Sequence, residues 1–432
     1  MGGDKNLDML IEAITGRVRR YLIGTEQEFV FKHIDSIDLP RIDKIDLYIH
    51  IPFCKNMCPY CPYNKVKYDK KLIKSYVNAM LNEIEQYYKR LGKIEISSIY
   101  IGGGTPTNLI DELAVILKKI RECFILTGDI AIETNPDDIN EEVINKLKRY
   151  GVTLLSLGVQ SFNDKCLTFL GRSYEASILP KAATLALSSH FKSVNFDLMF
   201  ALPGQNISDV INDLRKSFSL GVDQVTLYPL FTFPYSAAGK YLKLKKIKMP
   251  DIFTRRKMYK TIHQFCLDSG FQRVSVWGFK KGNTPRYSSV TRGCYIGLGA
   301  GAGSFVSSAF YFNTFSVGEY IKTLSSGKLP VALKMDVGTK LFRYYWLYWR
   351  LYDTYVPKKH FKELFGEEDK KIYRLLWLSK VLGLCREETN QFSLTERGAF
   401  WLHLMQNYFV LNYINKVWSV AMRKAWPDRI KI

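Results

Sequence analysis

Three cysteines, Cys54, Cys58 and Cys61, follow an alternating apolar segment, with three and then two residues between them. Iron–sulfur clusters are normally held by four cysteine thiolates. A set of only three, so close in sequence, therefore indicates a four-iron cluster in which one iron stays open to another ligand. A zinc site is the alternative, and it requires a fourth ligand nearby. His50 is the nearest candidate, but its position inside the apolar segment favours a structural role.

The other five cysteines share no local spacing, so we expect them to be small core residues, as is usual for free cysteine. Two of them could still approach in space and bind a second cluster. They are Cys123, Cys166, Cys266, Cys294 and Cys385. The chain length and a first segment without an apolar leader predict a cytoplasmic protein with reduced thiols rather than a disulfide-bonded secreted one.

The charge balance is strongly basic, with 62 Lys and Arg against 41 Asp and Glu, a net charge of +21. This balance favours anionic partners such as carboxylate-bearing or phosphorylated substrates, acidic proteins, nucleic acid or an anionic membrane surface. Charge alone does not choose among them. No stretch approaches the roughly 18 apolar residues that a membrane span needs.

From residue 46 onward, short strands rich in β-branched and aromatic residues alternate with amphipathic helices. The predicted strands are Leu47–Pro52, Ser98–Ile101, Ile130–Thr134, Leu154–Val159, Ser193–Met199 and Gln224–Tyr228. The predicted helices include Lys71–Leu91, Asp111–Cys123, Glu141–Tyr150, Ser177–Ser188 and Ser208–Leu220. This alternation predicts parallel β-α units, whose functional residues gather at the carboxyl ends of the strands.

Two strand ends carry residues that can bind a ligand. The run GGGTPT at residues 102–107 follows the second strand, and its glycines allow backbone amides to approach a ligand closely. Glu133 ends the third strand, where a carboxylate can accept hydrogen bonds from a ribose or an ammonium group. The alternative for this segment is a helix N-cap, for which Asn135 is the better candidate.

The cysteine spacing, with Tyr60 before the last cysteine, resembles the radical S-adenosylmethionine (SAM) superfamily. The wider run Y-I-H-I-P-F-C-x3-C-x-Y-C resembles the branch that contains oxygen-independent coproporphyrinogen III oxidase, related haem chaperones, and anaerobic haem-degrading and C-methylating enzymes. The runs at 102–107, 133–136 and 197–205 also resemble motifs of this family, with Ala201 in place of the usual glycine. The resemblance covers roughly residues 46–305.

The resemblance implies an α/β fold, in which a partial (β/α)6 radical SAM barrel is followed by an α-rich winged-helix-like C-terminal domain. It implies a 4Fe-4S cluster on Cys54, Cys58 and Cys61, one or two SAM molecules, and a reducing electron donor such as flavodoxin or ferredoxin. In that superfamily one electron from the cluster splits SAM and leaves a 5′-deoxyadenosyl radical, which removes hydrogen from the substrate.

The resemblance also assigns roles to single residues. Those implied to bind the first SAM are Tyr48, Tyr60, Gly103, Gly104, Thr105 and Glu133. Those implied to be catalytic and to line a second site, for another SAM or for the substrate, are Gln160, Arg172 and Asp197. Gly303 is implied to lie at the cofactor as well, in a glycine-rich run where haem chaperones usually carry histidine at this position.

Four domains are predicted. They are a helical lead-in at 1–45 with a helix at Leu7–Ile23, the barrel at 46–235, a family-specific extension with substrate-facing loops at 236–335, and an aromatic-rich winged-helix-like domain at 336–432. The expected C-terminal elements are helices at Lys340–Leu351, Lys358–Leu364, Lys370–Leu382 and Leu402–Val420, with a wing near 385–395.

This last domain raises the possibility of DNA binding, but Lys370–Leu382 offers few polar groups for base edges, so nucleic acid is not the expected partner. Its aromatic stripe predicts a core packed against the barrel. The final helix could contact a membrane surface, although core packing is the favoured interpretation because the helix lacks a clean basic face.

The segment from Trp277 to Ser289 corresponds to substrate-facing loops of the relatives. Four cations in or just beyond it could pair with propionates of a substrate or could simply be exposed. They are Lys280, Lys281, Arg286 and Arg292.

The function predicted from the sequence is that of a radical SAM oxidoreductase, similar to coproporphyrinogen III oxidase, that abstracts hydrogen from a tetrapyrrole. One alternative is a class C radical SAM methyltransferase that uses two SAM molecules on an apolar planar substrate. Another is a haem-binding chaperone with little catalysis, against which Gly303 counts. A DNA-binding regulator is the third.

Overall fold

The computed structural model describes residues 3–24, 29–231, 233–243, 248–288, 293–366 and 369–432. Its central feature is a run of six neighbouring parallel strands, which confirms the predicted β-α units. In spatial order these are β2 (Lys44–Ile51), β5 (Glu95–Gly103), β7 (Ile130–Thr134), β8 (Leu154–Gln160), β9 (Ser193–Phe200) and β10 (Gln224–Pro229).

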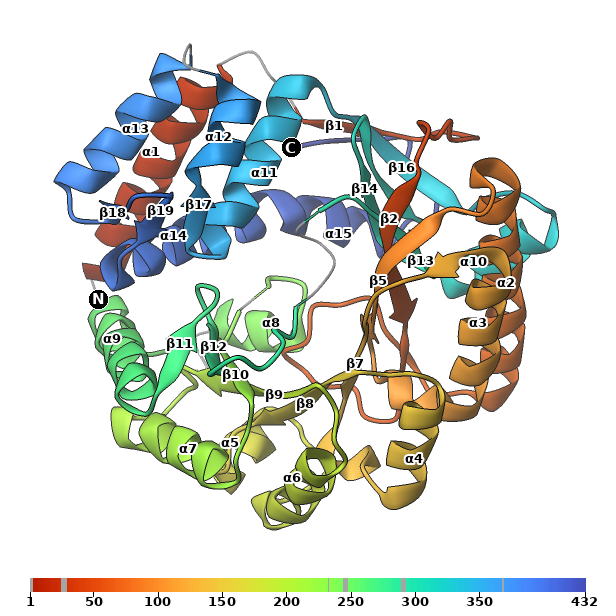
Figure 1. Ribbon diagram of the computed structural model, residues 1–432, viewed down its shortest axis with the longest axis horizontal. Helices are drawn as coiled ribbons and strands as arrows, with labels where there is room; N and C mark the ends of the chain where they lie inside the picture. Colours follow the sequence, from red (N-terminus) through yellow and green to blue (C-terminus); the bar gives the residue numbers. More distant parts are fainter. Residues whose placement is uncertain (1–2, 25–28, 232, 244–247, 289–292, 367–368) are drawn as a thin grey trace.

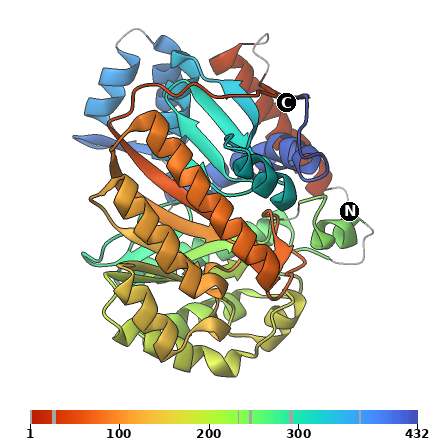
Figure 2. The same cartoon turned by 90° about the vertical axis from the view of Figure 1, so that its right-hand side faces the viewer.

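Helices cover the outer face of this run, as Figures 1 and 2 show. They are α2 (Lys70–Leu91), α3 (Ile110–Cys123), α4 (Glu141–Arg149), α5 (Asp164–Phe169), α6 (Leu179–Ser188) and α7 (Ile207–Ser219). Strand β8 is buried along its whole length, as expected for a parallel strand covered on both sides. Helix α2 begins where the Asp69 side chain accepts from two backbone amides, and it buries Ile73, Met80 and Ile84 against the sheet.

The sheet continues beyond both ends of the six-stranded run. The additional strands are β11 (Phe271–Arg273), β12 (Gly278–Lys281), β13 (Tyr295–Leu298), β14 (Gly303–Val306), β15 (Ala309–Asn313), β16 (Val331–Asp336), β1 (Val30–Lys32) and β20 (Arg429–Lys431). Strand β12 pairs antiparallel with β10, whereas β13 pairs in parallel with β2 and adds a seventh parallel strand to the run. The path between β11 and β20 has two ends, so the described strands form an open barrel rather than a closed one.

This continuity corrects the predicted domain boundaries. Residues 30–32 were assigned to a lead-in, but β1 pairs with β16 and β20 in the main sheet. The main sheet also spans the predicted boundary at residue 235, because β12 pairs with β10 and β13 pairs with β2. Barrel and extension therefore share one sheet, since β-strands with unpaired edges recruit whatever strand the chain brings beside them.

Residues 339–394 form a winged helix, as predicted. The elements are α11 (Thr339–Tyr352), β17 (Tyr355–Pro357), α12 (Lys358–Phe365), α13 (Lys370–Val381), β18 (Cys385–Glu387) and β19 (Gln391–Leu394), and the strands pair in the order β17-β19-β18. Helix α1 (Gly3–Ile23) packs beside α13 and α14 (Glu396–Phe409), so the N-terminal helix belongs spatially to this domain (Figure 1).

The final helical segment is part of the core, in line with the favoured interpretation. Helix α14 buries Phe400 and Leu404, and α15 (Asn415–Ala421) buries Val417. The prediction that the aromatic stripe of Lys370–Leu382 forms a core against the barrel is wrong. Helix α13 buries Ile372, but its Trp377 is 65% exposed and Val381 is 62% exposed, because apolar side chains occupy both faces and only one face is covered.

The remaining elements are short or lie between the larger ones. They are β3 (Phe53–Cys54), β4 (Val66–Lys67), β6 (Ile125–Leu126), α8 (Ala237–Lys243), α9 (Ile252–Asp268) and α10 (Val317–Ser325). Among the described residues, no helix combines the length and the apolar character that crossing a membrane requires.

Candidate functional site

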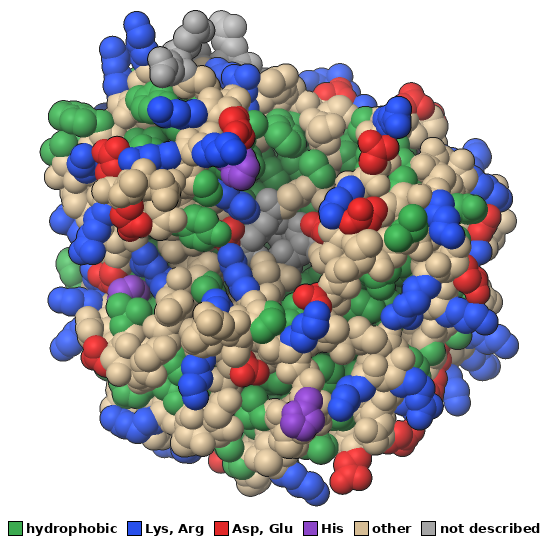
Figure 3. All heavy atoms as spheres, viewed as in Figure 1, with side chains coloured by type: hydrophobic (Ala, Val, Ile, Leu, Met, Phe, Trp, Pro, Cys, Tyr) green, Lys and Arg blue, Asp and Glu red, His purple; other side chains and the backbone are tan. Residues whose placement is uncertain are grey.

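A cavity of about 540 Å³ lies at the carboxyl ends of the parallel strands, between the barrel and the C-terminal domain. We call it the chamber. Figure 3 shows the molecule hollowed at the centre of the face that Figure 1 presents. Eleven of the thirteen predicted site residues line it: Cys54, Cys58, Tyr60, Cys61, Gly103, Gly104, Thr105, Glu133, Gln160, Arg172 and Asp197. The other two, Tyr48 and Gly303, do not.

The three predicted cluster cysteines lie on one loop whose ends are fixed by backbone pairing. Cys54 ends β3, which pairs with β4 in parallel, and its carbonyl accepts from the Tyr68 amide at 2.9 Å. Within the loop, Lys65 Nζ donates to the carbonyl of Cys58 at 3.1 Å and to that of Cys61 at 2.6 Å. The ammonium group therefore holds the two later cysteines in one turn.

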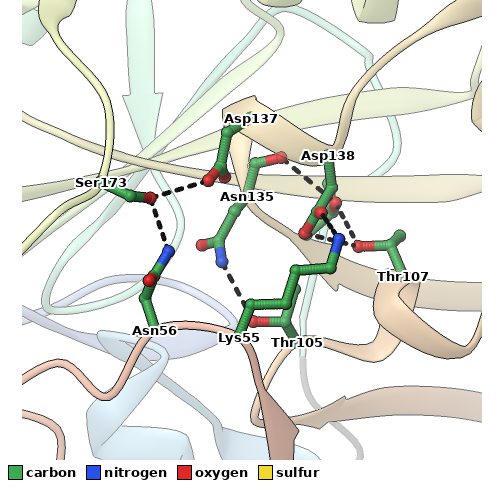
Figure 4. A network of polar contacts seen from close by, with 9 residues as sticks. Lys55, Asn56, Thr105, Thr107, Asn135, Asp137, Asp138 and Ser173 are labelled. Atoms are coloured by element: carbon green, nitrogen blue, oxygen red, sulfur yellow. Dashed lines mark hydrogen bonds and ion pairs between the residues drawn. The ribbon is translucent and has the colours of Figure 1, made fainter. Parts of the chain in front are cut away.

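A polar network, part of which lines the chamber, fastens this loop to the end of β7, as Figure 4 shows. Lys55 Nζ lies 3.0 Å from Asp138 Oδ1. Asn56 Nδ2 donates to Ser173 Oγ at 2.6 Å, and that hydroxyl donates to Asp137 Oδ2 at 2.9 Å. Because both loop residues are tied to side chains that follow other strands, the cysteine loop is held at the edge of the sheet.

The chemistry of this loop fits an iron–sulfur cluster. Burial raises the pKa of the Cys54 thiol to about 12, and the nearby Cys61 adds to the effect, so binding of metal must displace a proton. A Cβ on Gly104 would lie 2.8 Å from Cys54 Sγ, so only glycine lets this backbone approach the thiol. The only local alternative to a cluster, a zinc site completed by His50, lacks its fourth ligand, because the His50 ring nitrogens face Tyr48 Oη and the Asn64 carbonyl.

The turn after β5 explains why Tyr48 lies outside the chamber. Gly103 has φ +116°, and a Cβ there would lie 2.7 Å from His50 Nδ1. The His50 ring bonds Tyr48 Oη at 2.7 Å and the Asn64 carbonyl at 2.9 Å, and burial lowers its pKa to about 4. His50 is therefore structural, as predicted, while Tyr48 supports the glycine turn from behind rather than contacting the chamber.

Glu133 projects from the end of β7 into the chamber wall. Its carboxylate accepts a short hydrogen bond from Tyr100 Oη and one from the Gly103 amide at 3.4 Å. Burial raises the pKa of Glu133 to about 7, and the neighbouring Asp197 carboxylate adds to this, while the two hydrogen bonds oppose it. The carboxyl group is thus poised between its neutral and charged forms near neutral pH.

Arg172 and Gln160 converge above Gly158. Arg172 donates to Asn135 Oδ1 at 2.7 Å and to Tyr60 Oη at 3.0 Å. A Cβ on Gly158 would lie 3.0 Å from Gln160 Nε2, so the glycine makes room for both side chains. The Nε of Arg172 is buried without a hydrogen-bond partner among the described residues, which leaves a cationic donor at the chamber.

Gln160 itself has a strained backbone, with φ 66° at the end of β8. Its Oε1 accepts from Tyr228 Oη at 3.0 Å. The next residue, Ser161, donates to the buried Asp213, which also accepts from the Phe162 amide at 2.8 Å. A non-glycine residue in the left-handed region persists only where its surroundings fix it, and such positions concentrate at functional sites.

Asp197 lies at β9, next to Ser156 on β8. Its carboxylate accepts from Ser156 Oγ at 2.8 Å and from Asn195 Nδ2 at 3.0 Å. Burial raises the pKa of Asp197 to about 6, and these hydrogen bonds and the Arg172 cation oppose the shift. The Asp197 carboxylate is close enough to Glu133 to make the Glu133 carboxyl harder to ionise.

Aromatic side chains make the opposite wall of the chamber. They come from the loop after β10, from the 270s segment and from the C-terminal domain: Phe231, Phe233, Trp277, Tyr348, Trp349, Tyr352 and Trp418. The Trp418 ring lies nearly parallel to that of Phe233, with centroids 6.1 Å apart, and its indole nitrogen has no hydrogen-bond partner among the described residues. This wall offers flat apolar surface and few charges.

Of the four cations that could pair with propionates or be exposed, two have partners within the protein. Arg286 lines the chamber, but its guanidinium pairs with Asp353, which also binds Arg350 at 3.1 Å. Lys280 Nζ donates to the carbonyl oxygens of Gly282 and Thr284. Lys281 is exposed. Ser289 and Arg292 lie outside the described residues.

Gly303 lies on β14, away from the chamber. A Cβ at this position would lie 3.0 Å from the ring of Phe312 on the neighbouring strand β15. The cofactor role implied for Gly303 is therefore not supported, because the packing of β15 rather than a ligand occupies the space beside it.

The scattered cysteines are core residues, as predicted. Cys123, Cys166, Cys266 and Cys385 are buried, and Cys294 is half-buried. No second metal-binding group of cysteines is found among the residues that the structure describes.

Several chamber residues were missed by sequence reasoning. Tyr100 and Tyr228 bond Glu133 and Gln160, and the strand-end rule would have found Tyr228. Asn135, the candidate for a helix cap, stands at the N-cap position of the short 3-10 helix Pro136–Asp138, but its side chain donates to Thr105 at 3.0 Å and accepts from Arg172 rather than capping. The aromatic wall carried no signal, because a helical aromatic stripe can face a core or a cavity equally well.

Comparison with known proteins agrees with this geometry. Residues 48–216 match the radical SAM superfamily. The heme chaperone HemW of Lactococcus lactis is 30% identical over 288 residues, which cover 65% of this chain and 75% of that protein. HemW of Escherichia coli is 27% identical and covers 86% of this chain and 99% of its own length. The structure of E. coli coproporphyrinogen III oxidase aligns with a TM-score of 0.72 at 21% identity, covering 86% and 92% of the two chains.

The fold and the chamber together define a radical SAM protein, whose family implies a 4Fe-4S cluster and SAM. The chain belongs to the radical SAM superfamily, in the coproporphyrinogen III oxidase-like family that includes the heme chaperones.

Proposed function

We propose that this chain is a haem-binding chaperone that holds a 4Fe-4S cluster and SAM at the barrel side of the chamber and haem against the aromatic wall. The observation that carries the proposal is that wall, which faces the polar strand ends across a single cavity. The proposal replaces the oxidoreductase predicted from the sequence as the leading hypothesis, because the relatives named above are called heme chaperones.

The chamber suits a flat tetrapyrrole on physical grounds. Its volume of about 540 Å³ lies in the range of pockets for small molecules and cofactors, which are mostly apolar with a few oriented polar groups. Rings such as Trp349 and Trp418 gain by stacking on a planar partner. Since Arg286 is already paired with Asp353, we expect the macrocycle rather than its carboxylates to supply most of the contact.

On the barrel side, Cys54, Cys58 and Cys61 would hold the cluster, and the Gly103-Gly104 backbone, Glu133 and Arg172 would hold SAM. A bound cluster supplies one-electron chemistry to the SAM sulfonium. The chain contributes positioning: the glycine turn admits close approach, and the Glu133 carboxyl accepts hydrogen bonds from an ammonium or a ribose.

Radical SAM catalysis on a tetrapyrrole, or methyl transfer with two SAM molecules, is the second candidate. It is favoured by the near-complete set of implied SAM residues at the chamber, and by the absence of histidine among the described residues that line it. Haem carriers commonly use an imidazole as the iron ligand. A tetrapyrrole substrate without iron does not need an imidazole ligand, so a chamber lining without histidine is compatible with this second candidate.

One experiment separates the two functions. The anaerobically reconstituted chain is titrated with haem, then reduced with SAM present, and the products are analysed for 5′-deoxyadenosine and S-adenosylhomocysteine. Saturable, stoichiometric haem binding with little deoxyadenosine supports the chaperone. Deoxyadenosine that is lost in Cys58→Ala, without saturable haem binding, supports the enzyme, and added S-adenosylhomocysteine indicates methyl transfer.

A further inference from the structure

The exposed face of α13 carries large apolar side chains that the winged helix leaves uncovered. Their exposed fractions are 65% for Trp377, 44% for Leu378, 62% for Val381 and 49% for Leu382. Single exposed apolar residues are ordinary, but adjacent ones on one helix face mark a contact surface. The opposite face of the helix, with Ile372, belongs to the small core of the domain.

Helix α1 extends this apolar surface. It packs beside α13, and Lys371 Nζ lies 5.6 Å from the centre of the Tyr21 ring. Its exposed apolar residues include Met9 at 58% and Leu10 at 49%. Figure 1 shows the two helices side by side at the edge of the molecule, with the α13 side turned outward.

Cations flank the apolar residues. Lys370, Lys371 and Arg374 are exposed on the first half of α13, and Arg17 and Arg20 are exposed on α1. Figure 3 shows Lys and Arg side chains around hydrophobic ones at this edge of the molecule. We call the exposed residues of α13 and α1 together the basic apolar face.

Among the described acidic groups near this face, Glu12 of α1 is exposed and accepts from Tyr408 Oη at 3.1 Å, and two others are engaged within the winged helix. Asp369 caps α13 by accepting from the Ile372 amide. Glu387 on the wing lies 3.0 Å from both Lys358 and Lys380. The face therefore keeps an excess of positive charge, in a chain whose net charge is +21.

We propose that the basic apolar face docks the protein on the surface of an anionic phospholipid bilayer. Trp377 would sit at the headgroup level, where indole rings concentrate, and Leu378 and Val381 would enter the acyl boundary. Lysine and arginine stems lie along apolar surface while their charged ends reach phosphates. Each cation near such a surface strengthens binding roughly fivefold.

Charge selects this partner over two others. A second copy of the chain would bring the same cations together, and like charges at an interface are unfavourable. DNA is read by polar side chains at base edges, and the exposed second half of α13 presents Trp377, Leu378 and Val381 instead. An anionic bilayer satisfies both the charge and the apolar surface.

The test is co-sedimentation of the reconstituted full-length protein with vesicles of phosphatidylcholine, with and without phosphatidylglycerol. We expect binding that requires phosphatidylglycerol and weakens as salt rises. Trp377→Ser should weaken partitioning roughly tenfold, by the loss of one large buried apolar side chain. Arg374→Glu should weaken it at least about fivefold.

Two substitutions on the far side of the molecule serve as matched controls. Val115→Ser on α3 removes an apolar side chain that is 49% exposed, and Lys118→Glu reverses a cation on the same helix. Neither should change vesicle binding. Equal loss in Lys118→Glu and Arg374→Glu would mean that binding follows net charge alone and would overturn the proposal.

Two other outcomes would overturn the proposed docking on a bilayer. Absence of binding to the phosphatidylglycerol vesicles overturns the proposal directly. So does a dimer that forms without lipid and that Trp377→Ser dissociates, measured by analytical ultracentrifugation, because the face is then a contact between copies. The proposed haem function does not enter this test, so either proposal can fail without the other.

Discussion

The two walls of the chamber are built in different ways. On the barrel side, Glu133, Gln160 and Asp197 lie on three neighbouring strands, and each has a hydrogen-bond partner at 3.4 Å or closer. On the other side, Trp349 and Trp418 come from helical segments of the last hundred residues and meet the cavity as flat apolar surface. The barrel wall holds polar and charged groups in fixed positions. The aromatic wall provides flat apolar surface on which a planar ligand can pack.

The difference indicates that the two walls bind different ligands. Parallel strands are buried on both sides and held by backbone ladders, so groups at their ends are positioned firmly. Trp349 and Trp418 of the other wall lie on helices outside this sheet, so we expect them to be replaceable without disturbing the strand ends. We therefore expect substitutions on the barrel side to affect the cluster and SAM, and substitutions on the aromatic side to affect haem.

The largest expected effect comes from Cys58→Ala. With only two thiolates left on the loop, the reconstituted protein should contain no 4Fe-4S cluster, measured by iron and sulfide content and by its visible absorption. Cys123→Ala, which removes a core thiol from α3, is the matched control and should keep full cluster content. A cluster retained in Cys58→Ala would show that another residue supplies the third ligand.

Arg172→Ala should weaken SAM binding by about tenfold to a hundredfold, because hydrogen bonds to a charged group contribute roughly 1.5 to 3 kcal/mol. Calorimetric titration of the reconstituted protein measures this, and haem affinity should change little. The control is Arg215→Ala, whose guanidinium lies over the Phe265 ring on the outer helices. Unchanged SAM affinity together with weaker haem binding would reverse the assignment of the two walls.

Trp349→Ala should weaken haem binding roughly tenfold while leaving SAM affinity unchanged, since it removes one large ring from the aromatic wall. Absorbance titration with haem measures the effect. Trp401→Ala, a half-buried tryptophan of α14 outside the chamber lining, controls for general loss of packing. If both variants lose haem affinity equally, the aromatic wall has no specific role.

A further effect concerns pH and the barrel wall alone. Burial raises the pKa of Glu133 from 4.5 to about 7, so the folded state binds a proton that the unfolded chain has already released between these values. Its contribution to stability is therefore present below pH 4.5 and is lost as pH rises through about 7. Asp197 acts in the same direction, with its pKa raised to about 6.

Glu133→Gln should flatten this dependence by an amount of the order of 1 to 3 kcal/mol in the free energy of unfolding, measured by urea titration between about pH 5 and about pH 8. Glu141→Gln, which alters an exposed carboxylate of α4, should leave the slope unchanged. A steeper slope in Glu133→Gln would contradict the assigned direction.

Much of the barrel wall was predictable because its signals are local. Hydrophobic alternation located the six strands to within a few residues, and the strand-end rule then brought Cys54, Glu133 and Asp197 together. The winged helix was predictable for the same reason, since its helices and wing are contiguous segments.

The errors arose where the outcome depends on long-range packing. Which face of α13 is covered, and that β1 joins the main sheet, depend on contacts with segments hundreds of residues away. Tyr48 and Gly303 carry family motifs, yet one supports a turn and the other packs under Phe312. A residue that matches a family motif is expected to lie near the site. Whether its side chain points into the site depends on the pleat and the pairing register of its strand.

The central claim is that haem and the cluster occupy one chamber. It is tested most directly by recording the electron paramagnetic resonance spectrum of the reduced cluster before and after haem is added, in the wild type and in Trp349→Ala. The account predicts that bound haem alters the cluster signal in the wild type and that Trp349→Ala needs more haem for the same change. Stoichiometric haem binding that leaves the cluster signal unaltered would contradict it, because haem would then bind elsewhere on the molecule.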